Sequence, residues 1–209
     1  MQLMRMGVAV ATAVLLATGL TGCGEEGVDV PAQLTSQVDD RWEVVEDAGS
    51  SYAVGHGLVV QVDAGWTTYG DEREGIDGST FEWAIGLPNG TKPFPAALQM
   101  SAGQENTGAQ IDRGMAEAAE EIARVSPGYE LLDKGDVDVP GASEAKFLRF
   151  LRDVQLSDGS TAKAEQVTLM IGVADGVSSS IRFTAPQGEW DTLMKQAYES
   201  VKVTSEANA

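Results

Sequence analysis

Histidine and cysteine are almost absent from this chain of 209 residues, which contains one of each. A single cysteine excludes an internal disulfide framework and a cysteine-rich zinc site. A single histidine excludes catalytic and metal sites that need two imidazoles. Basic residues are also scarce, because 14 Lys and Arg stand against 32 Asp and Glu and give a formal net charge of −18. This charge argues against a nucleic-acid partner, since phosphates are bound by Lys and Arg.

The remaining composition is that of a folded protein. Hydrophobic residues make up 43% of the chain, which is too many for an intrinsically disordered acidic protein. The length corresponds to one ordinary domain with additional segments.

The N-terminus contains an apolar segment without any charge. Residues 7–20 are almost wholly Val, Ala, Leu, Gly and Thr, and Arg5 is the only charged residue before them. A helix needs about 20 apolar residues to cross a bilayer, so this run is too short. Its length and position are typical of the central region of a secretory signal peptide, which we predict over residues 1–22.

The apolar segment ends in Leu20, Thr21, Gly22 and Cys23. This ending resembles a bacterial lipobox, in which small residues precede a cysteine that is lipidated and becomes the new N-terminus. The resemblance implies cleavage after Gly22, a covalent diacylglycerol on Cys23, and a lipid-anchored protein on the extracytoplasmic face of the cell membrane. The alternative is an ordinary signal peptide followed by an incidental buried cysteine. Loss of Arg5 would bring the charge to −19, so an anionic membrane surface would repel the mature chain.

Residues 23–51 are predicted to hold the lipid anchor and a tether. Residues 24–30 are rich in Gly and Glu, whereas from Pro31 onward apolar residues recur at helical spacing. This spacing predicts an amphipathic helix that ends at residues 49–51. The alternative is a short edge strand over residues 41–46.

Residues 52–203 are predicted to form one domain, followed by a disordered tail over residues 204–209. Alternating hydrophobic residues and turn signals predict strands at 58–62, 81–87, 97–101, 129–139, 145–156, 162–173 and 177–184. Apolar residues at helical spacing predict helices from about 107 to 126 and from 189 to 200. This order predicts an α+β fold with an antiparallel sheet packed against helices.

The order of elements resembles the PsbP-like fold, and within it the actinobacterial LpqN-type lipoproteins. The resemblance covers about residues 57–203, and its sequence features are Gly65-Trp66 after the first strand, Gly141-Ala142-Ser143, the Asp158-Gly159 turn and the ending Ser200-Val201-Lys202-Val203. Relatives place a Pro before the Gly-Trp pair, where this chain has Asp63-Ala64, and they have a longer tether. The resemblance implies a surface lipoprotein without a catalytic residue to transfer.

Candidate catalytic and metal-binding residues are few. His56 lies between two glycines, and we interpret it as a turn residue because no nucleophile elbow accompanies it. Two Ser-x-x-Lys matches, Ser143 to Lys146 and Ser160 to Lys163, each lie at a predicted strand or hairpin, where residues three apart point to opposite faces. An acidic loop holds Asp71, Glu72, Glu74 and Asp77 but lacks the spacing of a calcium loop, which favours a solvated loop over a cation site. We therefore predict no catalytic residue, no metal and no cofactor other than the diacylglycerol on Cys23.

Three functions from different classes remain open. The first is a non-catalytic binding or assembly module with an unidentified protein partner, attached to the membrane through its anchor. The second is a carrier of a small molecule or lipid in a cleft between helices and sheet. An open apolar groove lined by Trp190, Met194 or Met115 would favour it, and a filled core would count against it. The third is a weak hydrolase, which needs two carboxylates about 5–9.5 Å apart.

Overall fold

The computed structural model describes residues 43–47, 50–55, 57–68, 73–74, 80–81, 83–86, 93–105, 108–174 and 176–204. The strands are β1 (Glu43–Asp47), β2 (Ser50–Gly55), β3 (Leu58–Val62), β4 (Thr67–Thr68), β5 (Arg73–Glu74), β6 (Thr80–Phe81), β7 (Trp83–Gly86), β8 (Ala97–Glu105), β9 (Glu130–Asp136), β10 (Ala145–Gln155), β11 (Thr161–Ala174), β12 (Val177–Pro186) and β13 (Lys202–Val203). The helices are α1 (Gly108–Val125), α2 (Trp190–Leu193) and α3 (Lys195–Glu199).

Two antiparallel sheets organise these elements into one α+β domain, as the sequence predicted. The larger sheet has the order β4-β7-β8-β12-β11-β10-β9, and the smaller has the order β1-β2-β3-β13. β5 and β6 pair only with each other. The predicted fold class is therefore confirmed.

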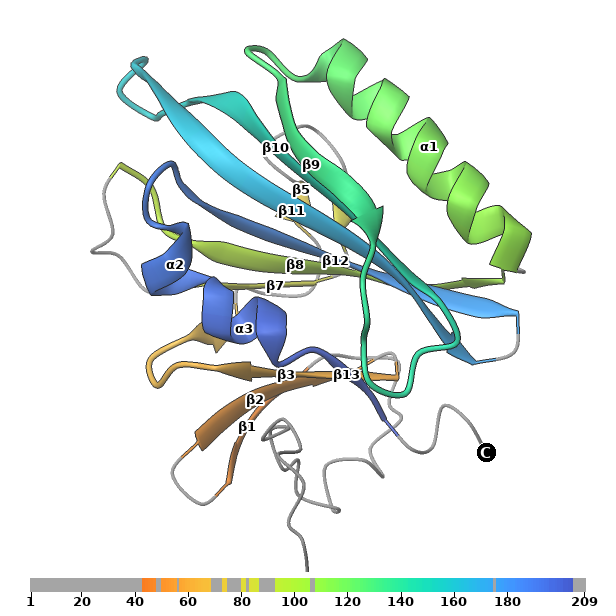
Figure 1. Ribbon diagram of the computed structural model, residues 1–209. Coiled ribbons are helices and arrows are strands. Elements are labelled where there is room, and N and C mark those ends of the chain that lie inside the picture. Colours follow the sequence, from red (N-terminus) through yellow and green to blue (C-terminus); the bar gives the residue numbers. More distant parts are fainter. Residues whose placement is uncertain are drawn as a thin grey trace, which may run out of the picture.

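Three long strands, β10, β11 and β12, form the centre of the larger sheet (Figure 1). The turn between β10 and β11 is the predicted Asp158-Gly159 pair. Gly159 has a φ of +83°, a conformation that glycine adopts at little cost, and Ser160 N–H donates to Asp158 Oδ1 at 2.9 Å. This turn sets the register that pairs Gln155 with Thr161 and continues along both strands.

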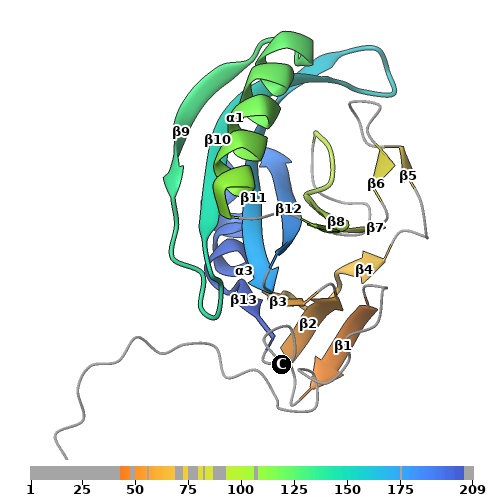
Figure 2. The same ribbon diagram turned by 90° about the vertical axis from the view of Figure 1, so that its right-hand side faces the viewer.

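The two faces of the larger sheet carry separate packing layers. On one face, α1 covers β10 and β11 (Figure 2). Met115 of α1 packs there with Leu148 and Phe150. On the other face, α2 and α3 cover the main core, which includes Leu169, Ile181, Phe183, Trp190 and Met194. Alternation along the strands sends successive side chains to opposite faces and so supplies both layers.

The structure corrects the prediction for the segment that precedes the domain. Residues 43–47 form strand β1 rather than a helix, which agrees with the alternative of a short edge strand. Val45 lies opposite Tyr52 of β2 and packs on Tyr52, Val54 and Val59. Pairing with β2 supplies hydrogen-bond partners for the backbone N–H and C=O groups of this segment. This pairing selects a strand although the apolar residues recur at helical spacing. The sheet thus begins before the predicted boundary at residue 52, which falls within β2.

The predicted helix over residues 189–200 is divided into α2 and α3. Met194 separates them with φ −122° and ψ −25°, outside helical values, while its side chain is fully buried. The predicted apolar stripe of this helical segment is confirmed, because Trp190, Met194, Ala197 and Val201 are all buried. The strand predicted at 97–101 is also longer than expected, since β8 extends to Glu105 and pairs with β12.

Candidate functional site

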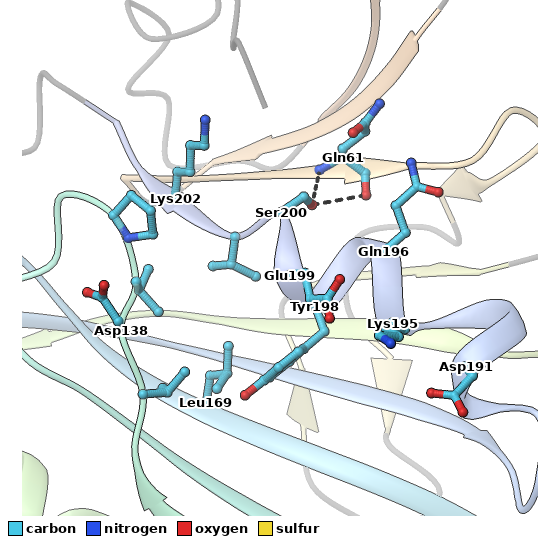
Figure 3. Close-up of a pocket in the computed structure, with 14 residues that line it drawn as sticks. Gln61, Asp138, Leu169, Asp191, Lys195, Gln196, Tyr198, Glu199, Ser200 and Lys202 are labelled. Atoms are coloured by element: carbon cyan, nitrogen blue, oxygen red, sulfur yellow. Dashed lines mark hydrogen bonds between the residues drawn. The ribbon is translucent and has the colours of Figure 1, made fainter. Parts of the chain in front are cut away.

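A groove of about 780 Å³ opens beside the C-terminal helices (Figure 3). α2 and α3 form one wall, residues 137–140 form the opposite wall, and β11 contributes to the floor. The residues that line it are Gln61, Val137, Asp138, Val139, Pro140, Leu169, Asp191, Lys195, Gln196, Tyr198, Glu199, Ser200, Val201 and Lys202.

The helical period of residues 189–201 explains why charged side chains reach this groove. The apolar positions of that period face the core, so the intervening positions remain at the surface. Asp191, Lys195, Gln196 and Glu199 are exposed and line the groove. The same amphipathic pattern that anchors α2 and α3 therefore supplies a rim with charges of both signs.

Tyr198 is held at the base of the groove by aromatic neighbours. Its ring centroid lies 5.8 Å from Phe183 and 5.9 Å from Trp190, both with edge-to-face geometry. Figure 3 shows the Tyr198 ring extending across the groove toward Leu169. Burial raises the pKa of the Tyr198 hydroxyl, so at neutral pH it is a neutral hydrogen-bonding group rather than a base.

Arg149 of β10 extends this aromatic cluster. Its guanidinium carbon lies 5.4 Å from the centroid of the Trp190 ring, within the range of a cation–π contact. Arg149 Nε also donates to Glu165 Oε1 at 2.7 Å, and Glu165 is buried. These contacts give the aromatic cluster a rigid charged neighbour.

Ser200 fixes the end of α3 against the smaller sheet. Its Oγ accepts a hydrogen bond of 2.8 Å from the backbone N–H of Gln61 (Figure 3). It also donates one of 2.8 Å to the carbonyl of Ala197. Ser200 is buried, so these bonds are shielded from solvent. The position of this wall of the groove therefore depends on a contact between β3 and α3.

A second groove, of about 250 Å³, lies between α1 and the β9–β10 pair. Met115 is among its lining residues, and Lys146 bridges the two sides. Lys146 Nζ lies 2.8 Å from Asp112 Oδ1 and 3.5 Å from Glu144 Oε1, and it also forms an ion pair with Asp136. Hydrogen bonds to Asp112 and Asp136 raise the pKa of Lys146, so this ammonium clamps α1 to the sheet.

The core next to the larger groove is filled. Trp190 and Met194 are buried within it and do not line the groove. Nine of the 14 lining residues are polar, counting Tyr198. The other five are apolar and supply apolar surface between the charged side chains: Val137, Val139, Pro140, Leu169 and Val201.

Most of the predicted site residues lie outside the residues that the structure describes. This holds for Leu20, Thr21, Gly22 and Cys23, for His56, and for Asp71, Glu72 and Asp77 of the acidic loop. Glu74 belongs to β5, of which only the backbone is described.

The two Ser-x-x-Lys matches do not form paired sites. Ser143 Oγ donates to the carbonyl of Gly172, while Lys146 binds the acids around α1. Ser160 Oγ donates to Asp158, while Lys163 lies 2.9 Å from Asp153 Oδ1. Each hydroxyl therefore has a different partner from its lysine. Ser143 precedes β10 and Ser160 precedes β11, so neither serine lies on a strand itself.

The described part of the chain lacks a metal-binding cluster and a membrane-spanning helix. It contains no group of three or more His, Cys, Asp or Glu residues that could hold a metal ion. None of its helices is long and apolar enough to span a membrane.

Sequence reasoning did not identify the larger groove. Tyr198, Lys195 and Glu199 lie on the predicted C-terminal helix, but their wall needs residues 137–140 opposite them to become a groove. The available signal was the polar face of that helix, which by itself is also typical of a solvated surface.

No family model and no curated protein matches this chain. Solved structures similar to it include the following two. PA94 from Pseudomonas aeruginosa, a protein of unknown function, has a TM-score of 0.40 and 14% identity, covering 72% of this chain and 87% of PA94. LpqN of Mycobacterium tuberculosis, which is involved in cell envelope biogenesis, has a TM-score of 0.47 and 17% identity, covering 78% of this chain and 91% of LpqN. Both comparisons concern the backbone, and neither assigns a function or a site residue to this chain.

Proposed function

We propose that the mature chain is a non-catalytic binding or assembly module of the cell envelope. A diacylglycerol on Cys23 holds it at the extracytoplasmic face of the cell membrane, and the groove beside α3 contacts a protein partner. The domain is a PsbP-like, LpqN-type lipoprotein domain without metal, catalytic residue or further cofactor.

The observation that carries the binding role is the groove itself. Its volume of about 780 Å³ lies in the range of ligand sites, about 300–1,000 Å³. Its rim presents Asp191, Lys195 and Glu199 to solvent around a base that includes Leu169 and Tyr198. A half-buried aromatic ring surrounded by charges is typical of the centre and rim of a protein interface.

The overall charge supports a basic partner. At −18, the chain attracts cationic surfaces, and such association weakens as salt shortens the Debye length to about 8 Å at 0.15 M. The same charge opposes nucleic acid and keeps the domain away from anionic lipid.

A carrier of a small polar molecule is the second candidate, since the groove has the volume for one. A lipid carrier would have to use the second groove, which Met115 lines, because Trp190 and Met194 are enclosed in the core. A weak hydrolase would have to use Asp138, Asp191 or Glu199, the carboxylates that line the groove.

Site-specific photo-crosslinking in cells tests the binding role. A crosslinking residue at Gln196, which is exposed in the groove, should form a protein adduct in the anchored chain. The same residue at Ser157, exposed in the β10–β11 turn, should not form it. Glu199→Lys should diminish the adduct, because it replaces an acidic rim charge that attracts a basic partner. Equal adducts from both positions would contradict a specific site at the groove.

Hydrolase assays test the absence of catalysis. The purified domain and its Asp138→Asn, Asp191→Asn and Glu199→Gln variants should show the same background in esterase, phosphatase, peptidase and glycosidase panels. Turnover that one of these substitutions abolishes would place the protein among the enzymes.

A further inference from the structure

Strand β9 forms one edge of the larger sheet. Within the described part of the chain, β9 pairs only with β10, whereas the opposite edge strand, β4, has only two residues. All seven residues of β9 are exposed. Among them, Leu131 and Leu132 keep 44% and 42% of their surface in contact with solvent. The sheet therefore ends in a strand with an accessible backbone and apolar side chains.

The backbone of β9 shows where an additional strand would bind. Asp133 lies opposite Arg149 and Leu131 opposite Phe150, so Leu132 is the extra residue of a bulge. From Asp133 to Asp136 the pairing with β10 is regular. Lys134 N–H donates to Asp133 Oδ1 at 2.8 Å, which means that this amide is turned away from β10. A neighbouring carboxylate thus occupies the position that the carbonyl of an added strand would take.

The charges along β9 favour a basic occupant. The strand contains three acidic residues, Glu130, Asp133 and Asp136, and one basic residue, Lys134. Asp136 already forms an ion pair with Lys146 of the same domain. A second copy of the chain fits poorly, because antiparallel pairing centred on Asp133 would set Asp133 against itself and Glu130 against Asp136. Like charges directly opposite each other destabilise a strand pair.

The tether of the same chain is an equally poor occupant. Residues 24–42 contain five acidic residues and one Arg, so their charge repels β9. The start of β9 also lies on the far side of the domain from β1, to which the tether leads (Figure 1). The edge is therefore available to another protein.

We propose that the edge of β9 binds a basic, extended segment of a protein partner as an added antiparallel strand. The proposal rests on the binding role above and specifies the chemistry of the partner. Lysine or arginine side chains of the segment contact Glu130 and Asp133, and alternate apolar side chains cover Leu131 or Leu132. Backbone hydrogen bonds from Lys134 and the alternate residues of β9 supply affinity that does not depend on the side chains.

Fluorescent peptides matched in length to the seven residues of β9 provide the probes. A peptide that alternates Val and Lys should bind the mature domain, and one that alternates Val and Glu should not. A Val-Lys peptide with methylated backbone nitrogens keeps the charge but loses its amide donors. It should bind roughly tenfold more weakly or worse, because each methyl group removes a backbone hydrogen-bond donor. Binding should also protect the Lys134 amide from hydrogen exchange.

Two kinds of variant test the edge directly. Lys134→Pro removes an outward N–H without removing a bond to β10, and it should abolish binding of the Val-Lys peptide. Glu130→Lys with Asp133→Lys changes two exposed residues and should transfer the preference to the Val-Glu peptide. Glu117→Lys with Glu120→Lys makes the same change of charge on the exposed face of α1 and should preserve the preference for Val-Lys. If the proline variant fails to fold, the comparison of these two double variants still tests the edge site.

The outcomes separate this proposal from the proposed function. Equal binding of the methylated and unmodified peptides, or equal loss of binding in both charge-reversed pairs, would show attraction by net charge alone and overturn the edge site. A dimer in sedimentation that Lys134→Pro dissociates would replace the basic partner with a second copy. Neither result affects the Gln196 adduct, and loss of that adduct leaves peptide binding at β9 intact.

Discussion

The backbone N–H of Gln61 donates to the hydroxyl of Ser200 at 2.8 Å, across 139 residues of sequence. This bond connects the smaller sheet to the end of α3, and both residues line the groove. The position of the groove wall formed by α3 therefore depends on how α3, near the C-terminus, packs against β3, near the start of the domain.

Ser200→Ala should destabilise the domain by about 0.5–1.5 kcal/mol, because the half-buried backbone amide of Gln61 loses its hydrogen-bond acceptor. Urea unfolding followed by circular dichroism measures this change. Ser157→Ala, in an exposed turn, is the control and should leave the free energy of unfolding almost unchanged. Equal stability of the two variants would mean that the Ser200 contacts contribute little.

Trp190→Ala should reduce the free energy of unfolding by about 3–5 kcal/mol, the usual cost of removing a buried tryptophan. Trp190 is 7% exposed and contacts Phe183 edge-to-face at 6.4 Å. Leu132→Ala removes an exposed apolar side chain and should cost far less. A loss below that of the Leu132 variant would contradict a structural role for the C-terminal helices.

Lys146→Met should lower the melting temperature by removing the ammonium between Asp112, Asp136 and Glu144. The folded state raises the pKa of Lys146, so it holds this proton more tightly than the unfolded chain does. The stabilisation is therefore complete below the ordinary lysine pKa of about 10.5 and is lost as the pH rises through the folded value.

Thermal unfolding at several pH values tests this dependence. The difference between wild type and Lys146→Met should stay constant from neutral pH to about 9 and shrink above about 10.5. Lys134→Met changes an exposed lysine of β9 and should show a small difference throughout. A wild-type advantage that persists at high pH would assign the effect to packing of the lysine side chain.

Cys23→Ala should leave an unprocessed precursor, whereas the wild-type chain should begin at Cys23 and carry the mass of a diacylglycerol. Detergent partitioning and N-terminal mass spectrometry measure both properties. Mature protein that begins at another residue and lacks lipid would contradict the anchor.

The sequence by itself determined the elements whose signals are local. The apolar stripe of residues 190–201, the α1 helix and the Asp158-Gly159 turn depend on neighbours a few residues away, and all three are present in the structure. The alternation of the long strands likewise predicted the antiparallel sheet.

Only the tertiary structure decided whether residues 43–47 form a helix or a strand, because the partner β2 supplies the hydrogen bonds that select the strand. It also placed residues 137–140 opposite α3, which turned the polar face of a helix into a groove. The position of β9 at the edge of the sheet could not be predicted from the sequence either, because the residues of a strand do not indicate which other strands lie beside it. Each of these features depends on contacts between surfaces that assemble only when distant segments pack together.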